Sequence, residues 1–172
     1  NGNKIITTGG GGMILTGTEL GARAKHLTTT ARQPHPVAFV HDEVGFNYRL
    51  PNINAALGCA QLERLEQFVD AKRALADRYR AYLKDSGLAF VTEPEGCRSN
   101  YWLNAVVCAD EKERDALLGA TAAAGVMTRP VWQPMHLLPM FKECPRGDLT
   151  MTTWLSARIV NLPSSVPPDQ AS

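Results

Sequence analysis

Residues 1–13 read Asn1-Gly2-Asn3-Lys4-Ile5-Ile6-Thr7-Thr8-Gly9-Gly10-Gly11-Gly12-Met13. In this stretch Lys4 precedes apolar, β-forming residues and then four consecutive glycines. Glycine lets a backbone turn tightly, so the chain can fold back near the lysine amine. A lysine amine can form a Schiff base when burial or neighbouring charge lowers its pKa. The stretch therefore predicts an amine held beside a flat, phosphorylated cofactor, and the alternative is a solvated lysine in a flexible linker.

The composition is that of a globular protein. The chain has 172 residues, of which 44% are hydrophobic and 20% are charged, enough for a core in one domain or in a small domain plus part of another. The net charge of +1 gives no electrostatic reason to expect nucleic acid or an anionic membrane as a partner. No apolar run reaches the length of a membrane-spanning helix, and the opening residues do not read as a signal segment.

The four cysteines favour neither a metal site nor a disulfide framework. Cys59, Cys97, Cys108 and Cys144 form no CxxC pair, and none has a histidine at zinc-ligand spacing. Disulfides are uncommon in a chain this long and this apolar. Reduced thiols, a cytoplasmic location and no bound metal are therefore expected.

Both ends of the chain predict a piece of a longer protein. The chain does not begin with methionine, and its first residue falls in what reads as the middle of a loop. Residues 167–172 are polar and rich in proline, so they are expected to be disordered or truncated. The sequence is interpreted as the second half of a longer chain.

Hydrophobic patterning divides the first part of the chain into short elements. A capping box at residues 16–19 predicts a helix that runs to about residue 27. Before this helix, residues 13–15 read as a short strand, and after it residues 28–36 read as a polar loop. Residues 39–51 are aromatic and charged without a regular period, and irregular segments of that length tend to be functional.

The rest of the chain predicts an α/β unit with a small, mostly antiparallel sheet. Apolar residues at three- and four-residue steps predict one long helix from about residue 53 to residue 85, with Asn52 as its N-cap and Gly87 as its left-handed stop. Strands are expected at residues 89–91, 101–108 and 126–132, and helices at residues 111–124 (ended by Gly125) and 149–162.

Three segments, taken together, resemble one enzyme family. They are Asn3-Lys4 with residues 8–13, the run HDEVGFNYRLPN at residues 41–52, and residues 55–63 with the pattern AALG followed by QLE. In this order and spacing the chain resembles, over nearly all 172 residues, the C-terminal half of the sugar aminotransferases of the DegT/StrS type. These are fold-type I enzymes that use pyridoxal 5'-phosphate (PLP). The likeness is greatest to enzymes that aminate nucleotide-linked 4-keto-6-deoxy sugars for bacillosamine, legionaminic acid or perosamine.

The resemblance implies roles for residues in the first two of these segments. Lys4 matches the lysine that forms the Schiff base with the cofactor and shuttles a proton. Asn47 matches the asparagine that reaches the cofactor phosphate of the other subunit in a homodimer. Tyr48 and Arg49 would lie beside it as substrate-binding residues, with Arg49 suited to a phosphate or a carboxylate. The alternative for residues 46–49 is an ordinary surface turn.

Two further substrate-binding residues, Trp132 and His136, are implied in the second half. Residues 132–136 resemble the family's loop in which a histidine approaches the sugar nucleotide, although a lone histidine is usually structural or solvated. Trp132 and the pair Tyr101-Trp102 could wall the sugar or the base, whereas aromatic residues in strands are more often part of a core.

The resemblance also implies a domain arrangement and a function. Residues 1–52 would be the end of the PLP-binding large domain and an inter-subunit loop, and residues 53–172 the long linking helix and the small C-terminal domain. The implied reaction is transamination of a nucleotide-linked 4-keto-6-deoxy sugar to the 4-amino sugar, with glutamate as donor, for surface polysaccharide or nonulosonic acid synthesis.

Two alternatives to this function concern Lys4 and the missing half. A relative with histidine in place of the lysine performs sugar 3-dehydration, and Lys4 argues against that reaction. In this family the other cofactor ligands precede the lysine, so the isolated fragment is expected to be inactive. The remaining alternative is a non-catalytic folded or dimerisation fragment.

Overall fold

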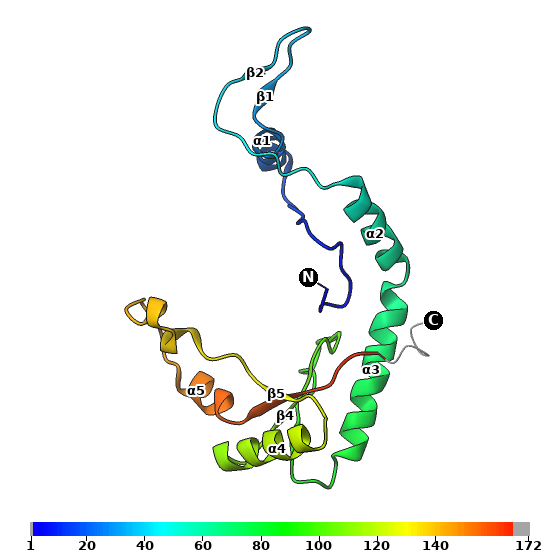
Figure 1. The fold of residues 1–172 in the computed structure, drawn as a ribbon, viewed down its shortest axis with the longest axis vertical. Coiled ribbons are helices and arrows are strands. Elements are labelled where there is room, and N and C mark those ends of the chain that lie inside the picture. The colour runs from blue at the N-terminus through cyan, green and yellow to red at the C-terminus, as the bar shows by residue number, and fades with distance from the viewer. Residues whose placement is uncertain (1, 167–172) are drawn as a thin grey trace. The chain divides into compact units, whose positions relative to one another are not determined.

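A computed structural model describes residues 2–166 of the chain (Figure 1). The chain forms two compact units, residues 1–65 and residues 66–172. Residues 167–172, which are expected to be disordered or truncated, lie outside the described residues. The domain boundary expected after residue 52 refers to the domains of a complete enzyme, and it stays a prediction.

The first unit contains two helices and a two-stranded hairpin. Helix α1 spans Thr18–Thr28 and α2 spans Asn52–Glu63, with Pro51 rather than the expected Asn52 in the N-cap position. Between the helices, β1 (Arg32–Gln33) and β2 (Val40–His41) pair antiparallel. The prediction of irregular loops over residues 28–36 and 39–51 is wrong where these two strands form. The sequence does not reveal them, because strands of two residues are too short to show a hydrophobic period.

Two further expectations for the first unit are wrong in detail. Residues 13–15 are not a strand: Met13 and Leu15 are 82% and 87% exposed, and within residues 2–166 no strand pairs with them. Helix α1 starts behind Gly17, which makes no side-chain capping bond, so the capping box does not form. The helix itself lies where the sequence predicts it and ends one residue later.

The long helix predicted over residues 53–85 is two helices. Helix α3 (Leu65–Tyr82) begins two residues after α2 ends. At Arg64, between the two helices, the backbone amide donates to the Gln61 carbonyl at 3.3 Å, which is the tighter bonding of a three-residue turn. Neither proline nor glycine occupies this junction, so the hydrophobic period continues across it and hides the break.

The second unit is built on a four-stranded antiparallel sheet, which confirms the predicted fold class. The strand order is β3 (Ala89–Phe90), β4 (Asn104–Val107), β6 (Ile159–Leu162) and β5 (Arg129–Pro130). Val106 and Val160, which are paired across β4 and β6, are fully buried. Around them pack Cys108 and the hydrophobic side chains Leu83, Leu88, Phe90, Leu117, Leu118 and Leu162, two of which come from helix α4 (Glu111–Ala123).

The predicted helix over residues 149–162 is correct only in its first half. After two 3₁₀ turns, η1 (Met135–Leu137) and η2 (Pro139–Phe141), helix α5 covers Thr150–Ser156 and the chain then enters β6. Strand β6 begins with two β-branched residues and lies between β4 and β5, so pairing on both edges overrides the helical period.

The other predicted elements of the second unit are confirmed in place, although the strands are shorter than predicted. Strands β3, β4 and β5 fall inside the expected segments, and α4 ends one residue before residue 124. Gly87 and Gly125 adopt positive φ values of 82° and 72° after their helices, as left-handed stops do.

No helix in the part of the chain that the structure describes is long and apolar enough to cross a bilayer. The four cysteines are free thiols, of which Cys108 is buried. Burial is the main cause that raises the pKa of the Cys108 thiol. The cytoplasmic location stays a prediction.

A charged network fastens the loop before β4 to helix α3. Arg73 pairs with both carboxylate oxygens of Glu93, at 2.8 and 2.9 Å, and also donates to the Ser99 carbonyl. The Ser99 amide donates to Glu93 at 2.6 Å, and the Glu93 amide donates to the hydroxyl of Tyr101, which is buried with a φ of 43°. The Arg73 guanidinium and then the Ser99 amide lower the pKa of Glu93 to about 2. The network therefore holds the residue that precedes Trp102.

We expect Gly45→Ala to destabilise the protein. A Cβ atom at this position would lie 2.4 Å from backbone atoms of Thr30 and Ala31, and overpacking of this kind lowers the free energy of unfolding by about 1–3 kcal/mol. Urea denaturation measures the change. The matched control is Gly21→Ala in α1, where the nearest atom is 3.8 Å away and a gain of about 0.5–1 kcal/mol is expected. Equal stabilities of the two variants would contradict the packing argument.

We also expect Glu93→Gln to change how stability depends on pH. The pKa of Glu93 is about 2 in the fold against an ordinary value of 4.5, so its stabilising effect is present above pH 4.5 and is lost as pH falls through 2. The variant should be less stable at neutral pH and should lose less stability over this acid range. Urea denaturation at several pH values tests this, with the exposed Glu95→Gln as control. Parallel curves for wild type and Glu93→Gln would count against it.

Candidate functional site

The end of α1 pairs through its backbone with the segment that follows β2. Backbone hydrogen bonds of 2.7–3.0 Å connect residues 27–30 with residues 46–48 and place Thr29 opposite Asn47 in an antiparallel bridge. On the same segment the rings of Phe46 and Tyr48 stack with centroids 5.3 Å apart. The helix end, rather than a loose loop, therefore sets the position of Asn47.

Strained backbone lies next to this bridge. Thr30 and Ala31 have positive φ values of 73° and 48°, which non-glycine residues rarely adopt. Ala31 is fully buried, and Gly45 passes so close to it that a larger residue would meet backbone atoms. Strain of this kind costs about 1–3 kcal/mol per residue, tends to cluster at functional sites and persists only where the surroundings over-determine the conformation.

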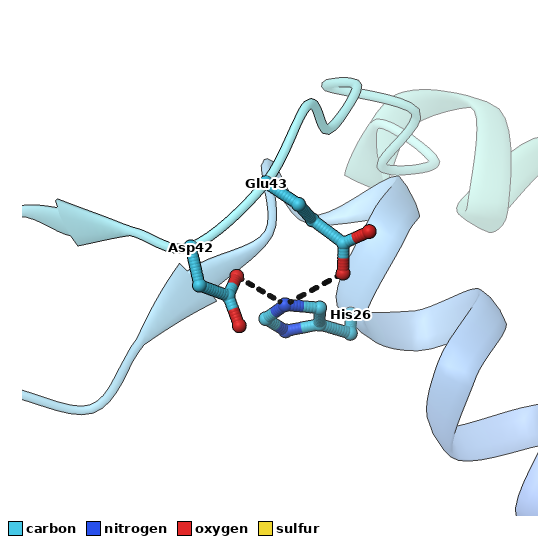
Figure 2. A group of neighbouring side chains, drawn as sticks. All are labelled: His26, Asp42 and Glu43. Carbon is cyan, nitrogen blue, oxygen red and sulfur yellow. Dashed lines mark hydrogen bonds and ion pairs between the residues drawn. The ribbon is translucent and has the colours of Figure 1, made fainter.

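A group of charged side chains joins α1 to the end of the hairpin, and three of them are drawn in Figure 2. The Nε2 atom of His26 lies 2.7 Å from Asp42 Oδ1 and 3.5 Å from Glu43 Oε1. Arg23 donates to both oxygens of Glu43, and the Gln33 amide donates to Asp42. Gln33 and then His26 lower the pKa of Asp42, and Arg23 lowers the pKa of Glu43.

This polar cluster fastens the hairpin to α1. His26, Asp42 and Glu43 each offer a possible ligand atom, all within 4.8 Å of one another. Arg23, however, already donates to both oxygens of Glu43, and Gln33 donates to Asp42 Oδ2. Sequence reasoning gave these residues no role. A signal was present, since Arg23 and His26 are three residues apart and share one face of the helix.

Both sides of the backbone pairing contribute to an open cavity of about 530 Å³. Residues 11–14, Thr28 and residues 47–51 line it, so three of the predicted site residues meet the glycine stretch here. Gly11 has a φ of 111°, and a Cβ atom on it would lie 2.6 Å from Leu50 Cδ1. The positive φ therefore requires glycine at this position, and a larger residue would also displace the Leu50 side chain.

Arg49 connects the side chain of Asn47 to the helix end. Its Nη1 atom donates to Asn47 Oδ1 at 2.7 Å, and its Nη2 atom donates to the Thr29 carbonyl at 3.2 Å. The cavity thus has an amide and a guanidinium on one wall and glycine backbone on another. Such groups are donors suited to an anion.

Lys4 is exposed, and contacts with α2 hold the segment that follows it. The Thr7 amide donates to Gln61 Oε1 at 3.2 Å, and Asn54 Nδ2 donates to the Thr8 carbonyl at 2.5 Å. A Cβ atom on the buried Gly58 would lie 2.9 Å from Thr8 Cγ2. Sequence reasoning had no role for Asn54, Gly58 or Gln61, although Gly58 and Gln61 are among the residues that carry the family resemblance.

The remaining predicted site residues, Trp132 and His136, belong to the second unit. The Trp132 ring is 69% exposed and stacks on Trp102 with centroids 6.3 Å apart. Trp132 lines a cavity of about 560 Å³, and His136 lines another of about 350 Å³ together with Cys144 and Arg146. Trp132 is therefore a surface residue, whereas Trp102 is half-buried and Tyr101, for which the core was the same alternative, is buried.

Comparison with known proteins places the chain in a family. The sequence matches the DegT/DnrJ/EryC1/StrS aminotransferase family over residues 1–170. It is 38% identical over 143 residues to the EpsN protein of Bacillus subtilis (strain 168), a match that covers 82% of this chain and 37% of that protein. It is 36% identical over 164 residues to the GDP-perosamine synthase of Escherichia coli O157:H7, covering 95% of this chain and 44% of the synthase.

A solved structure shares the fold as well. The aminotransferase TlmJ from Streptoalloteichus hindustanus superposes with a TM-score of 0.76 at 26% identity, covering 89% of this chain and 42% of TlmJ. The chain spans 37–44% of the length of these two curated relatives. The family match extends over almost every residue, and the chain therefore belongs to the DegT/DnrJ/EryC1/StrS aminotransferase family.

Proposed function

We propose that the chain is part of a PLP-dependent aminotransferase that converts a nucleotide-linked 4-keto-6-deoxy sugar into the 4-amino sugar. Glutamate is the proposed amino donor, and the product serves surface polysaccharide or nonulosonic acid synthesis. The observation that carries the proposal is the cavity that Asn47 and Arg49 share with the glycine stretch, in a chain that belongs to this family. Similarity to a GDP-perosamine synthase supports a nucleotide-linked sugar as the substrate class.

The donors of this cavity fit the phosphate of the cofactor. The Asn47 amide offers N–H groups, and the backbone of Gly11 and Gly12 admits close approach of an anion. In the proposal Asn47 holds the phosphate of the cofactor that belongs to the other subunit of a homodimer. Tyr48, which is 72% exposed in this chain, then faces that subunit's substrate.

Lys4 is the proposed catalytic residue. PLP, when bound, supplies an aldehyde carbon and a ring that withdraws electrons from the reacting carbon. The Nζ atom of Lys4 would hold the cofactor, and the same amine would accept and return the proton at the reacting carbon of the substrate. The contacts of Thr7 and Thr8 with α2 hold the backbone that carries this amine.

The second unit provides the proposed substrate surface. Trp132, supported by the ring of Trp102, offers a flat apolar face to a sugar or a base. His136 shares its cavity with Arg146, so this cavity combines an imidazole with a cation suited to the diphosphate of a nucleotide sugar. Trp132 and His136 are therefore the residues that we assign to substrate binding, together with Tyr48 and Arg49.

Exposed apolar side chains in the first unit support an assembly with more protein. The following residues are between 78% and 88% exposed: Met13, Leu15, Val37, Phe39 and Val44. Exposed apolar surface on this scale marks interaction sites. We propose that a large domain and a second subunit cover it, with residues 1–52 belonging to the large domain and the inter-subunit loop and residues 53–172 to the small domain.

The alternative is a non-catalytic fragment that folds or dimerises. The two proposals differ in what happens on incubation with PLP. The complete enzyme should gain a visible absorbance band, whereas the 172 residues alone should remain colourless and inactive, because the curated relatives are more than twice as long. A full-length protein that stays colourless after incubation would favour the non-catalytic alternative.

Lys4→Ala is expected to abolish transamination in the full-length protein, by about 10²–10⁴-fold or more, because both the covalent attachment and the proton transfer are lost. Borohydride reduction followed by mass spectrometry should find the cofactor on Lys4 in the wild type and nowhere in the variant. Lys25→Ala, at an exposed lysine of α1, is the control and should keep full activity. Turnover by the Lys4→Ala variant would refute the assignment.

Asn47→Ala is expected to weaken PLP binding by about tenfold or more, the loss expected when a hydrogen bond to a charged group disappears. Titration of the apoenzyme with PLP, followed by absorbance, gives the dissociation constant. Asn161→Ala, which removes a half-buried amide in β6, serves as the control and should bind PLP as the wild type does. An unchanged dissociation constant for Asn47→Ala would show that this residue does not reach the cofactor.

A further inference from the structure

The side chain of Arg49 is tied to both sides of the Thr29–Asn47 bridge. One terminal nitrogen, Nη1, donates to Asn47 Oδ1 at 2.7 Å, and the other, Nη2, donates to the backbone carbonyl of Thr29 at 3.2 Å. The two acceptors lie opposite each other across the antiparallel bridge. The fork of the guanidinium therefore spans a fixed piece of backbone and the amide of Asn47 at the same time.

This contact decides which end of the Asn47 amide meets a ligand. A guanidinium has N–H donors and no acceptor, so the amide atom that it contacts must be the oxygen. The NH₂ group of Asn47 then lies at the opposite end of the amide, away from Arg49. Phosphate oxygens only accept hydrogen bonds when the phosphate is fully ionised, so an NH₂ group binds them and an amide oxygen repels them. A flipped amide would reverse the sign of the interaction.

The backbone around the contact between Arg49 and Asn47 is held in place, so the contact can fix the orientation of the Asn47 amide. The backbone of Asn47 is paired with Thr29, and the turn that follows Thr29 is held in its left-handed conformation by the buried Ala31 and by Gly45. With its backbone fixed, Asn47 can change the orientation of its amide only through its side-chain torsions. Arg49 binds the amide oxygen and so fixes that orientation.

We propose that Arg49 is a positioning residue that acts on the cofactor phosphate through Asn47, by fixing the amide with its NH₂ group toward the phosphate. The inference rests on the proposed function and deepens it. It differs from the expectation that the guanidinium itself binds a phosphate or carboxylate, because the guanidinium fork is directed at Asn47 and Thr29. Loss of Arg49 therefore harms PLP binding only while Asn47 is present.

A double-mutant cycle on the full-length protein tests this dependence. The dissociation constant of PLP is measured by absorbance titration for wild type, Arg49→Met, Asn47→Ala and the double variant. Methionine keeps an apolar stem but removes the charge and all donors. Arg80→Met, at an exposed arginine paired with Asp77, controls for the loss of a surface arginine. Should Arg49→Met not fold, Arg49→Lys takes its place, since one ammonium group cannot reproduce the guanidinium fork.

The expected result is that Arg49→Met weakens PLP binding several-fold in the wild type and leaves it unchanged in the Asn47→Ala background. Two results would overturn the inference while leaving the proposed function intact. The first is losses that multiply in the double variant, which would mean that Arg49 contacts the phosphate itself. The second is an Arg49→Met variant that binds PLP normally while Asn47→Ala does not. Normal binding by Asn47→Ala would instead remove the cofactor contact of the proposed function, and the inference with it.

Discussion

The backbone pairing between residues 27–30 and residues 46–48 is the constraint on which the first unit depends. Among residues 2–65, Ala31 is the hydrophobic side chain that the structure buries, whereas the second unit has Val106 and Val160 at the centre of a sheet. Hydrogen bonds contribute about 0.5–1.5 kcal/mol each, so a few of them and the polar cluster around His26 must hold the hairpin. A unit built in this way has its apolar surface still available for other protein to cover.

Strands β3, β4 and β5 and helix α4 of the second unit could be predicted because their signals are local. Short apolar runs, a helical period over residues 111–124 and glycines at the helix ends all report on neighbouring residues, and the structure agrees with them. The break at Arg64 and the strand β6 could not be predicted in this way. The first has no proline or glycine to announce it, and the second becomes a strand because β4 and β5 pair with it from distant parts of the chain.

The candidate site also has a part that the sequence could predict and a part that it could not. The resemblance singled out Asn47, Tyr48 and Arg49, and the structure brings all three to one cavity with the glycine stretch, although their roles remain predictions. What the sequence could not provide is the way in which they are held. The contact of Arg49 with Thr29 spans 20 residues and that of His26 with Asp42 spans 16, and side-chain contacts at such separations leave no periodic trace. The sequence also could not show whether Trp132 belongs to the core, and the structure shows that its side chain is exposed.

Helix α2 contacts the segment that follows Lys4, which gives a structural reason why residues 55–63 belong to the resemblance. The AALG and QLE patterns have no assigned catalytic role, yet Gln61 accepts the Thr7 amide and Gly58 admits Thr8 at a distance that a methyl group would fill. Asn54, one turn earlier, binds the Thr8 carbonyl. A lysine that serves as base and as covalent ligand must present its amine within a fraction of an ångström, and a long, flexible side chain achieves this only from a fixed backbone. In the proposed role of Lys4, the helix therefore supports the chemistry by position, and the break after Glu63 separates this helix from α3.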